Sequence, residues 1–259
     1  MQIIKSFLLG IIQGLTEFLP VSSSGHLVIF QKILGFNTGQ LTLDVFLHFG
    51  TLIPVIIIFW DDIKDIVLFK KDKHHLIYLI IVGAIPTAVI GILFKDFFTS
   101  LFESVLNTGF MLLITGILLY LAEILSKTKK EIIDFKTHNA FLVGLVQSMA
   151  IIPGISRSGA TIVASLLQGL KREDAARYSF LLSIPVIFGA NLLELFDVMG
   201  NGLVGLTWPV IIAGVFSSAV AGYLAIKYLL YVLRTGSLII FSYYCWLVGF
   251  MVIIWAGLF

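Results

Sequence analysis

Residues 10–25, GIIQGLTEFLPVSSSG, return 134 residues later in altered form as residues 144–159, GLVQSMAIIPGISRSG. The glycine, glutamine, serine, serine and glycine at positions 10, 13, 22, 24 and 25 all recur at that offset. Each copy carries a proline and a serine-rich turn between two short apolar segments. Polar residues repeated inside hydrophobic segments predict a site built between two halves of a membrane protein.

The repetition extends well beyond this stretch, at an offset near 131 residues. Seven residues of the first half are matched by identical residues in the second half: Phe49, Pro54, Gly83, Ala88, Val89, Gly91 and Phe110 correspond to Phe180, Pro185, Gly214, Ala219, Val220, Gly222 and Phe241. We therefore expect a single membrane domain over residues 1–259. It divides into repeat 1, about residues 1–134, and repeat 2, about residues 135–259.

The composition is that of an integral membrane protein. Hydrophobic residues make up 59% of the chain, charged residues only 12%, and the mean hydropathy is +1.05, which excludes a soluble domain. A net charge of +2 without a basic stripe gives no reason to expect a nucleic-acid partner. The single cysteine, Cys245, excludes an internal disulfide. We expect the first apolar run to belong to the fold rather than to a cleaved signal, because Gln13 and Glu17 interrupt it and it returns in mid-chain.

Six stretches are long and apolar enough to cross a bilayer as helices. They are Leu41–Trp60, Leu76–Phe94, Leu106–Leu125, Ala175–Phe196, Trp208–Tyr231 and Ser237–Trp255. Two further regions, Met1–Leu34 and Thr137–Leu170, are broken near their middle by proline, serine and glycine. Short broken segments at matching places in two repeats are typical of re-entrant hairpins. The expected fold is all-α: six transmembrane helices plus two re-entrant helical hairpins in an inverted-topology repeat.

The distribution of basic residues supports this layout. If each hairpin returns to its own side, the loops fall into two sets, one with 13 Lys and Arg residues and the other with three. Because cytoplasmic loops carry the excess of positive charge, the first set is expected in the cytoplasm. The first hairpin then enters from outside and the second from inside, so their polar tips are expected to meet near mid-membrane.

The first tip carries an amide and a carboxylate. Gln13 and Glu17 are spaced i, i+4 and share one face of a half-helix. Ser22, Ser23, Ser24, Gly25 and His26 follow and open the second half-helix. A carboxylate inside a membrane costs several kcal/mol, roughly 2.5–3.5 on insertion scales, and is therefore a functional-site candidate. Gln13 and Glu17 offer hard oxygen ligands for Mg²⁺ or Ca²⁺. His26 and Ser23 are both candidate nucleophiles, and His26 is also a candidate general acid or base.

The second tip is suited to binding phosphate. It reads PGISRSGAT over residues 153–161, a glycine- and serine-rich turn that opens a helix and presents free backbone N–H groups. Arg157 adds a planar fork for two phosphate oxygens. The expected binding residues at the two tips are Ser22, Ser24, Gly154, Ser156, Arg157, Ser158, Gly159 and Thr161. His48, by contrast, is interpreted as a packing residue or an indirect partner of the site.

With these motifs in place, the chain resembles the bacterial undecaprenyl-diphosphate phosphatase family, also known from bacitracin resistance. The resemblance covers the whole length. It rests on Gln13 and Glu17 running into a Leu-Pro-x-Ser-Ser-x-Gly-His stretch, here residues 19–26, and on a Pro-Gly-x-Ser-Arg-Ser-Gly-x-Thr motif, here residues 153–161.

The resemblance implies a metal-dependent membrane hydrolase that removes the terminal phosphate of a polyprenyl diphosphate. Such an enzyme regenerates the lipid carrier for peptidoglycan and other wall polymers. The implied location is the bacterial plasma membrane, with the pocket open to the outer face. By the same resemblance, Glu17 belongs to the metal site, His26 is the essential histidine, Ser23 is a candidate nucleophile, and Arg157 binds the diphosphate with Ser156 and Thr161.

A lipid flippase or secondary transporter is the alternative, because facing re-entrant hairpins in inverted repeats are also a transporter architecture. Gln13 and Glu17 opposite Arg157, with His26 nearby, favour the enzyme, since transport needs no nucleophile beside a metal. The oligomeric state stays open, a homodimer included, because the glycines of the fifth predicted crossing suit packing within a chain and between chains.

Overall fold

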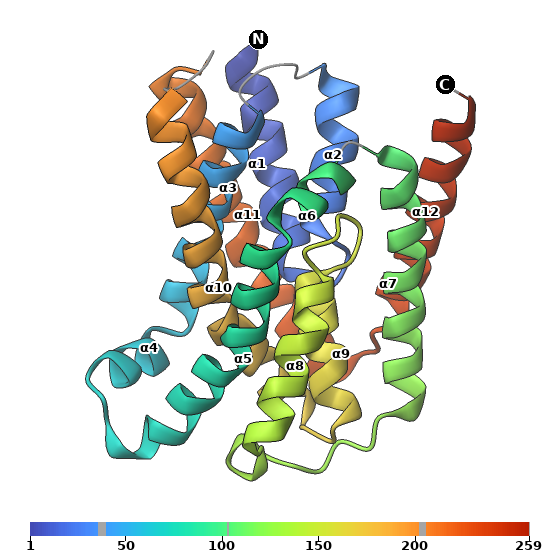
Figure 1. Ribbon diagram of the computed structural model, residues 1–259. Helices are drawn as coiled ribbons and strands as arrows, with labels where there is room; N and C mark the ends of the chain where they lie inside the picture. The colour runs from blue at the N-terminus through green and yellow to red at the C-terminus, as the bar shows by residue number, and fades with distance from the viewer. Residues whose placement is uncertain (36–39, 103, 202–205, 259) are drawn as a thin grey trace.

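The computed structural model describes residues 1–35, 40–102, 104–201 and 206–258, and their secondary structure is helical throughout, without a named strand. In chain order the α-helices are α1 (Gln2–Phe18), α2 (Ser23–Leu34), α3 (Gln40–Ile58), α4 (Trp60–Val67), α5 (His74–Leu93), α6 (Lys95–Leu101), α7 (Val105–Leu125), α8 (Thr137–Met149), α9 (Arg157–Leu167), α10 (Arg172–Asn201), α11 (Trp208–Thr235) and α12 (Ile239–Leu258). Two short 3₁₀ helices, η1 (Lys71–Lys73) and η2 (Ile132–Asp134), lie in connections. Figure 1 shows the long helices as one bundle.

Five of the described helices, α5, α7, α10, α11 and α12, contain a segment long and apolar enough to cross a membrane. A sixth span results if α3 and α4, which meet at an angle of 90°, are counted together. All six predicted crossings therefore coincide with helices, and the all-helical membrane class is confirmed, with five or six spans by this measure. The short helices α4 and α6 were not expected from the sequence.

Both regions that the sequence predicts to be broken are pairs of shorter helices. α1 ends at Phe18 because the next residue, Leu19, precedes Pro20 and is extended, with ψ 141°. α2 begins where the Ser22 side chain accepts a hydrogen bond from the Gly25 backbone N–H at 3.3 Å. Figure 1 shows α1 and α2 entering the bundle from the end that holds the N-terminus, whereas α8 and α9 enter from the opposite end.

The turns of the two helix pairs touch each other. The Ser22 hydroxyl donates to the Ile155 carbonyl at 3.3 Å, and the Ser158 hydroxyl donates to the Leu19 carbonyl at 3.2 Å. These two hydrogen bonds run in opposite directions between residues more than 130 positions apart. Residues around the two breaks are therefore brought to one place inside the bundle.

The two helix pairs are held by close packing against long helices from the other half of the chain. α1 packs on α11, and α8 packs on α5. A Cβ atom at Gly10 would lie within 3.0 Å of the Gly214 carbonyl oxygen, and one at Gly144 would lie within 3.0 Å of the Gly83 carbonyl oxygen. The sequence offsets relate Gly10 to Gly144 and Gly83 to Gly214, so the same close contact occurs twice.

We expect Gly10→Ala to destabilise the protein by about 1–3 kcal/mol, because an added methyl group must push α1 away from α11. The measurement is the apparent Tm of purified protein in detergent. Gly189→Ala is the matched control: it lies inside α10 and its Cβ would meet no atom of the described residues within 4 Å, so the Tm should hold or rise slightly. An unchanged Tm in Gly10→Ala would contradict the close approach of α1 and α11.

Candidate active site

Glu17 is the centre of a buried polar cluster in the bundle interior. Its side chain is 5% exposed, and the Oε1 atom lies 2.5 Å from Nη2 of Arg157. The Oε2 atom accepts two hydrogen bonds, from the Gln13 amide at 2.9 Å and from the Ser23 hydroxyl at 2.6 Å. Four of the residues that the sequence singled out, drawn from α1, α2 and α9, are thus in direct contact.

The ion pair joins the two halves of the chain, since Glu17 lies near the end of α1 and Arg157 begins α9. Arg157 is 13% exposed, so both charges are largely removed from solvent. Buried charges persist only when they are paired or hydrogen-bonded, and removing one partner leaves the other uncompensated. The Glu17–Arg157 pair therefore fixes the two turns relative to each other. It also places a carboxylate and a guanidinium in the same buried site.

His48 of α3 reaches the same carboxylate. Its Nε2 atom lies 3.7 Å from Glu17 Oε2, and its Nδ1 atom lies 2.7 Å from the Asp44 carbonyl oxygen. A carbonyl only accepts, so Nδ1 carries a proton and Nε2 faces Glu17. Sequence reasoning left His48 as a packing residue or indirect partner, and its place beside Glu17 supports the second of these.

Two atoms of the cluster have unused hydrogen-bonding capacity. Gln13 Oε1 and Arg157 Nη1 are buried and have no hydrogen-bond partner among the described residues. Buried polar atoms are nearly always paired, and an unpaired one calls for a ligand, an ion or water. Arg157 therefore presents N–H donors to an anion, while Gln13 presents an oxygen to a cation or a donor.

In the predicted glycine- and serine-rich turns, most polar groups make hydrogen bonds that stabilise the turns. Ser156 caps α9 by accepting from the Gly159 N–H at 3.0 Å, and its hydroxyl lies 3.2 Å from that of Ser158. Gly154 adopts φ +100°, which favours glycine, and its carbonyl accepts from Thr115 at 2.8 Å. Ser24 lies beside Ser22 with 3.4 Å between hydroxyls. These residues surround the cluster, and their substrate-binding role stays a prediction.

Thr161 and His26 are directed elsewhere. The fully buried Thr161 hydroxyl lies 2.6 Å from that of Ser179 in α10 and also contacts the Arg157 and Ser158 carbonyls. Both ring nitrogens of His26 are engaged outside the Glu17 cluster, Nδ1 with the Ser22 carbonyl at 2.8 Å and Nε2 with the Tyr244 hydroxyl at 2.9 Å. No signal in the sequence pointed to Tyr244.

The donors at the site fit a cation that is only partly held by protein. Within the described part of the chain, no group of three His, Cys, Asp or Glu side chains could hold a metal ion. Gln13 and Glu17, the expected ligands, supply oxygen atoms, and one of these has no partner among the described residues. Hard cations such as Mg²⁺ often take one or two protein oxygens and complete their shell with water and substrate phosphates. The residues present fit that mode.

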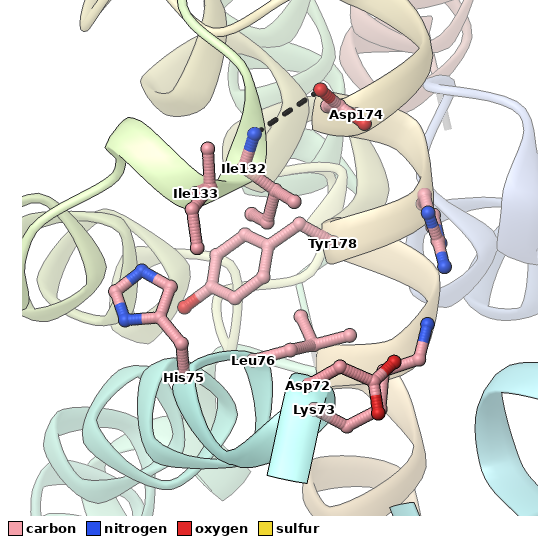
Figure 2. Close-up of a pocket in the computed structure, with 9 residues that line it drawn as sticks. Asp72, Lys73, His75, Leu76, Ile132, Ile133, Asp174 and Tyr178 are labelled. Carbon is pink, nitrogen blue, oxygen red and sulfur yellow. Dashed lines mark hydrogen bonds between the residues drawn. The ribbon is translucent and has the colours of Figure 1, made fainter. Parts of the chain in front are cut away.

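A separate pocket of about 80 Å³ lies at the opposite end of the bundle from the N-terminus (Figure 1), between η1, η2 and the start of α10 (Figure 2). Figure 2 shows the Asp174 carboxylate accepting from the Ile132 N–H, which measures 3.2 Å. The cations beside this pocket are paired: Asp62 accepts from Arg177 Nε at 2.7 Å and from Lys73 at 3.1 Å. Its described basic residues therefore differ from Arg157, which keeps a buried and unused N–H.

Asp62→Asn is expected to lower the apparent Tm at neutral pH by loosening this end of the bundle. Burial alone would raise the pKa of Asp62, but the hydrogen bonds from Arg177 and Lys73 lower it below its ordinary value. A carboxyl whose pKa is lowered on folding stabilises the protein above its unfolded pKa of about 4, and the stabilisation is lost as the pH falls through the folded pKa.

The Tm values of wild type and Asp62→Asn should therefore converge in acid. Asp61→Asn, at an exposed neighbouring position, is the control and should change the Tm little at any pH. A Tm difference between wild type and Asp62→Asn that is constant from neutral to acid pH would contradict the ionic role of Asp62.

Comparison with known proteins identifies relatives over nearly the whole chain. The family model described as "Bacitracin resistance protein BacA" matches residues 6–251. A protein of Halothermothrix orenii named "Undecaprenyl-diphosphatase" is 66% identical over 259 residues and covers 100% of both chains. Proteins with the same name from Carboxydothermus hydrogenoformans and Alkaliphilus metalliredigens are each 46% identical, covering 96% and 97% of this chain and 96% and 98% of their own lengths.

Proposed function

Since the chain belongs to the bacitracin resistance protein BacA family, we propose that it is a multi-pass membrane enzyme that dephosphorylates undecaprenyl diphosphate. The product would be undecaprenyl phosphate, the lipid carrier for peptidoglycan synthesis, and rapid regeneration of this carrier would oppose bacitracin. One observation carries the proposal beyond the names of relatives. A hydroxyl, a carboxylate and a guanidinium with an unused N–H are joined in one buried cluster of Ser23, Glu17 and Arg157.

The architecture that we propose has six crossings and two re-entrant hairpins, α1–α2 and α8–α9, in an inverted-topology repeat. The matched pairs of close glycine contacts, Gly10 with Gly214 and Gly144 with Gly83, support an internal repeat. The excess of Lys and Arg in one set of loops supports an orientation in the plasma membrane with α1 and α2 on the outer side. The substrate would then reach Glu17 from the outer leaflet.

In the proposed mechanism Arg157 binds the diphosphate. Its Nη1 has no partner among the described residues, whereas Nη2 is paired with Glu17 and can be shared with a phosphate oxygen. A guanidinium placed against the non-bridging oxygens stabilises the charge that these oxygens carry in the transition state. Arg157 and Ser158 open α9, so their amide groups add the favourable end of a helix dipole. The N–H groups of Ser156 and Gly159, by contrast, already donate to hydroxyl groups of the protein.

Ser23 is the nucleophile in this mechanism and Glu17 its base. The Ser23 hydroxyl already donates to Glu17 Oε2 at 2.6 Å, the arrangement that activates a serine. The Ser23 oxygen forms a bond to the terminal phosphorus, the bond from that phosphorus to the bridging oxygen breaks, and undecaprenyl phosphate leaves. Glu17 accepts the Ser23 proton and passes it to the departing undecaprenyl phosphate. Water then attacks the phosphoserine, releasing inorganic phosphate and restoring the Ser23 hydroxyl. His26 is less suited to attack, because both of its nitrogens are hydrogen-bonded.

We further propose that a divalent cation, Mg²⁺ or Ca²⁺, is held by Gln13 Oε1 and Glu17 together with phosphate oxygens. When bound, it would neutralise charge on the phosphate and so favour attack by an anionic or polarised oxygen. The support is the buried oxygen of Gln13, which lacks a partner among the described residues and belongs to a side chain already in contact with Glu17.

Gln13→Glu should strengthen cation binding by about 10-fold, because a second carboxylate is a better ligand than a neutral amide for a hard cation. The measurement is the Kd for Mn²⁺, used as a spectroscopic probe, in detergent without substrate. Gln147→Glu is the matched control: Gln147 is almost as buried and its Oε1 also lacks a partner among the described residues, but its amide donates to Thr87 rather than to a carboxylate. Equal Mn²⁺ affinity in Gln13→Glu and wild type would argue against a cation at Gln13.

The decisive experiment is phosphate release from a prenyl diphosphate by purified protein in detergent, with Mg²⁺ or Ca²⁺ and then with EDTA. Release that EDTA abolishes would support the metal-assisted phosphatase. Release that persists in EDTA would support the phosphatase without the cation. A folded protein that binds the diphosphate but releases no phosphate would overturn the enzyme and favour the transporter, since detergent leaves no second compartment for transport.

A further inference from the structure

His26 connects the strained turn at the Glu17 cluster to the last helix of the chain. The ring is 3% exposed and bridges two partners, the Ser22 carbonyl through Nδ1 and the Tyr244 hydroxyl through Nε2. Tyr244 belongs to α12, 218 positions away in the sequence. The two rings are stacked, with 5.7 Å between centroids and 11° between planes.

The chemistry of the partners determines the direction of both hydrogen bonds. A backbone carbonyl only accepts, so Nδ1 of His26 must carry a proton and donate to Ser22. In the neutral ring Nε2 then bears the lone pair and accepts from the Tyr244 hydroxyl. The Ser22 carbonyl thus sets the tautomer, and the Tyr244 hydroxyl adds a hydrogen bond to Nε2 that stabilises the ring in the same orientation.

The turn that His26 contacts is strained. Ser22 has φ 71°, a left-handed conformation that L-residues adopt at a cost of about 1–3 kcal/mol. Such a conformation persists only when neighbouring contacts hold it. The Ser22 carbonyl accepts from both the backbone N–H of His26 at 3.2 Å and its Nδ1 at 2.8 Å. The next residue is Ser23, whose hydroxyl lies 2.6 Å from Glu17.

The packing of α12 adds to this link. Cys245, the residue after Tyr244, is fully buried, and its Sγ lies 3.7 Å from the Pro20 carbonyl. Two consecutive residues of α12 therefore contact this region, Cys245 at the turn between α1 and α2 and Tyr244 at the first turn of α2. Tyr244 itself is 41% exposed, so its hydroxyl is not needed to fill the core.

We propose that Tyr244 is a positioning residue for the reaction. Its hydroxyl holds the His26 ring in place through Nε2, the ring holds the Ser22 carbonyl through Nδ1, and the strained turn then presents the Ser23 hydroxyl to Glu17. In this role His26 touches neither substrate nor the reacting atoms. The inference rests on the proposed phosphatase function, and it assigns to α12 a part in catalysis that neither motif of the sequence contains.

Tyr244→Phe keeps the stacked ring and removes only the hydroxyl. We expect kcat to fall by about 10-fold with KM unchanged, because small misplacements of a reacting group are costly. The apparent Tm should stay at the wild-type value. Tyr243→Phe is the matched control: Tyr243 is a more exposed neighbour that makes a ring contact with Trp246, so the variant should keep full activity. Wild-type kcat in Tyr244→Phe would overturn the proposal.

Two conservative replacements of His26 separate positioning from catalysis. The shorter amide of His26→Asn can offer its N–H where Nδ1 lies, whereas the longer amide of His26→Gln reaches only the Nε2 position. If His26 positions the turn, His26→Asn should retain at least about 10-fold more activity than His26→Gln. Equal loss in both variants would mean that Nε2 acts on the substrate and would overturn the positioning role.

A double-mutant cycle tests whether Tyr244 acts through His26. In that case His26→Asn combined with Tyr244→Phe should be no less active than His26→Asn alone, since the link is already broken. Additive losses would mean that Tyr244 acts independently and would overturn the inference. Failure of the proposed function is distinguishable, because the wild-type protein would then release no phosphate at all.

Discussion

Glu17→Gln is expected to lower kcat by at least about 10³-fold, within the range for losing a positioned general base. The glutamine can keep contacts with Gln13 and Arg157, but it cannot take the proton of Ser23. The loss should fall on kcat rather than on substrate binding. In the structure Glu17 accepts a hydrogen bond from Nη2 of Arg157, and its carboxylate therefore competes with a phosphate for this guanidinium. In EDTA, where no cation held by Glu17 contributes, affinity for the diphosphate should therefore hold or increase in the variant.

The matched control is Glu123→Gln. Glu123 also pairs with an arginine, Arg172, at 2.5 Å and is similarly shielded, with 14% of the side chain exposed. Glu123 lies near the end of α7, outside the Glu17 cluster, and also accepts a hydrogen bond from the Leu238 N–H. This variant should keep near-normal turnover. Phosphate release and binding of a non-hydrolysable diphosphate are the two measurements. Near-normal kcat in Glu17→Gln would sink the assignment of the site.

Arg157→Ala should lower kcat/KM by about 10³-fold or more, the scale of loss seen when an arginine that stabilises a phosphoryl transition state is removed. Here both binding and turnover should suffer, because the fork contributes to holding the diphosphate and to stabilising the transition state. The variant also leaves the carboxylate of Glu17, which is 5% exposed, without the positive charge of its arginine partner. We therefore expect a lower apparent Tm alongside a protein that still folds.

Arg157→Lys distinguishes the charge from the fork. A lysine ammonium keeps the positive charge but cannot bind two oxygens in one plane, so activity should recover only in part. Arg172→Lys is the control, because Arg172 donates to Glu123 and to the Gly236 carbonyl, outside the Glu17 cluster, so this variant should keep full activity. Inorganic diphosphate binding, followed by calorimetry, should be lost in Arg157→Ala. Full activity in Arg157→Ala would contradict a diphosphate-binding role.

Most of the helical layout could be predicted from hydropathy alone. The predicted crossing Leu41–Trp60 ends within two residues of the end of α3, because Asp61 and Asp62 end the apolar run. The breaks at Pro20 and Pro153 could also be predicted, since proline restricts the preceding residue and lacks a donor N–H. The 90° bend into α4 could not, because the local sequence there is compatible with a continuous helix.

The site was only partly accessible from the motifs. Gln13, Glu17, Ser23 and Arg157 could be named because charged and polar side chains inside a membrane are costly and stand out. His48 could not be assigned to the site, since a histidine in an apolar helix gives no indication of its partner. The Thr161 hydroxyl lies in a motif suited to phosphate and contacts Ser179 in the structure, and its substrate-binding role stays a prediction.

The sequence by itself determined the membrane class, the breaks in both helix pairs, the internal repetition and the residue types at the two tips. These follow from local chemistry: hydropathy, proline geometry and the cost of charge in lipid. The tertiary structure alone decided which polar atoms meet, including Arg157 with Glu17 and His26 with Tyr244. Such contacts join residues 140 and 218 positions apart. They depend on how whole helices pack, which no local pattern records.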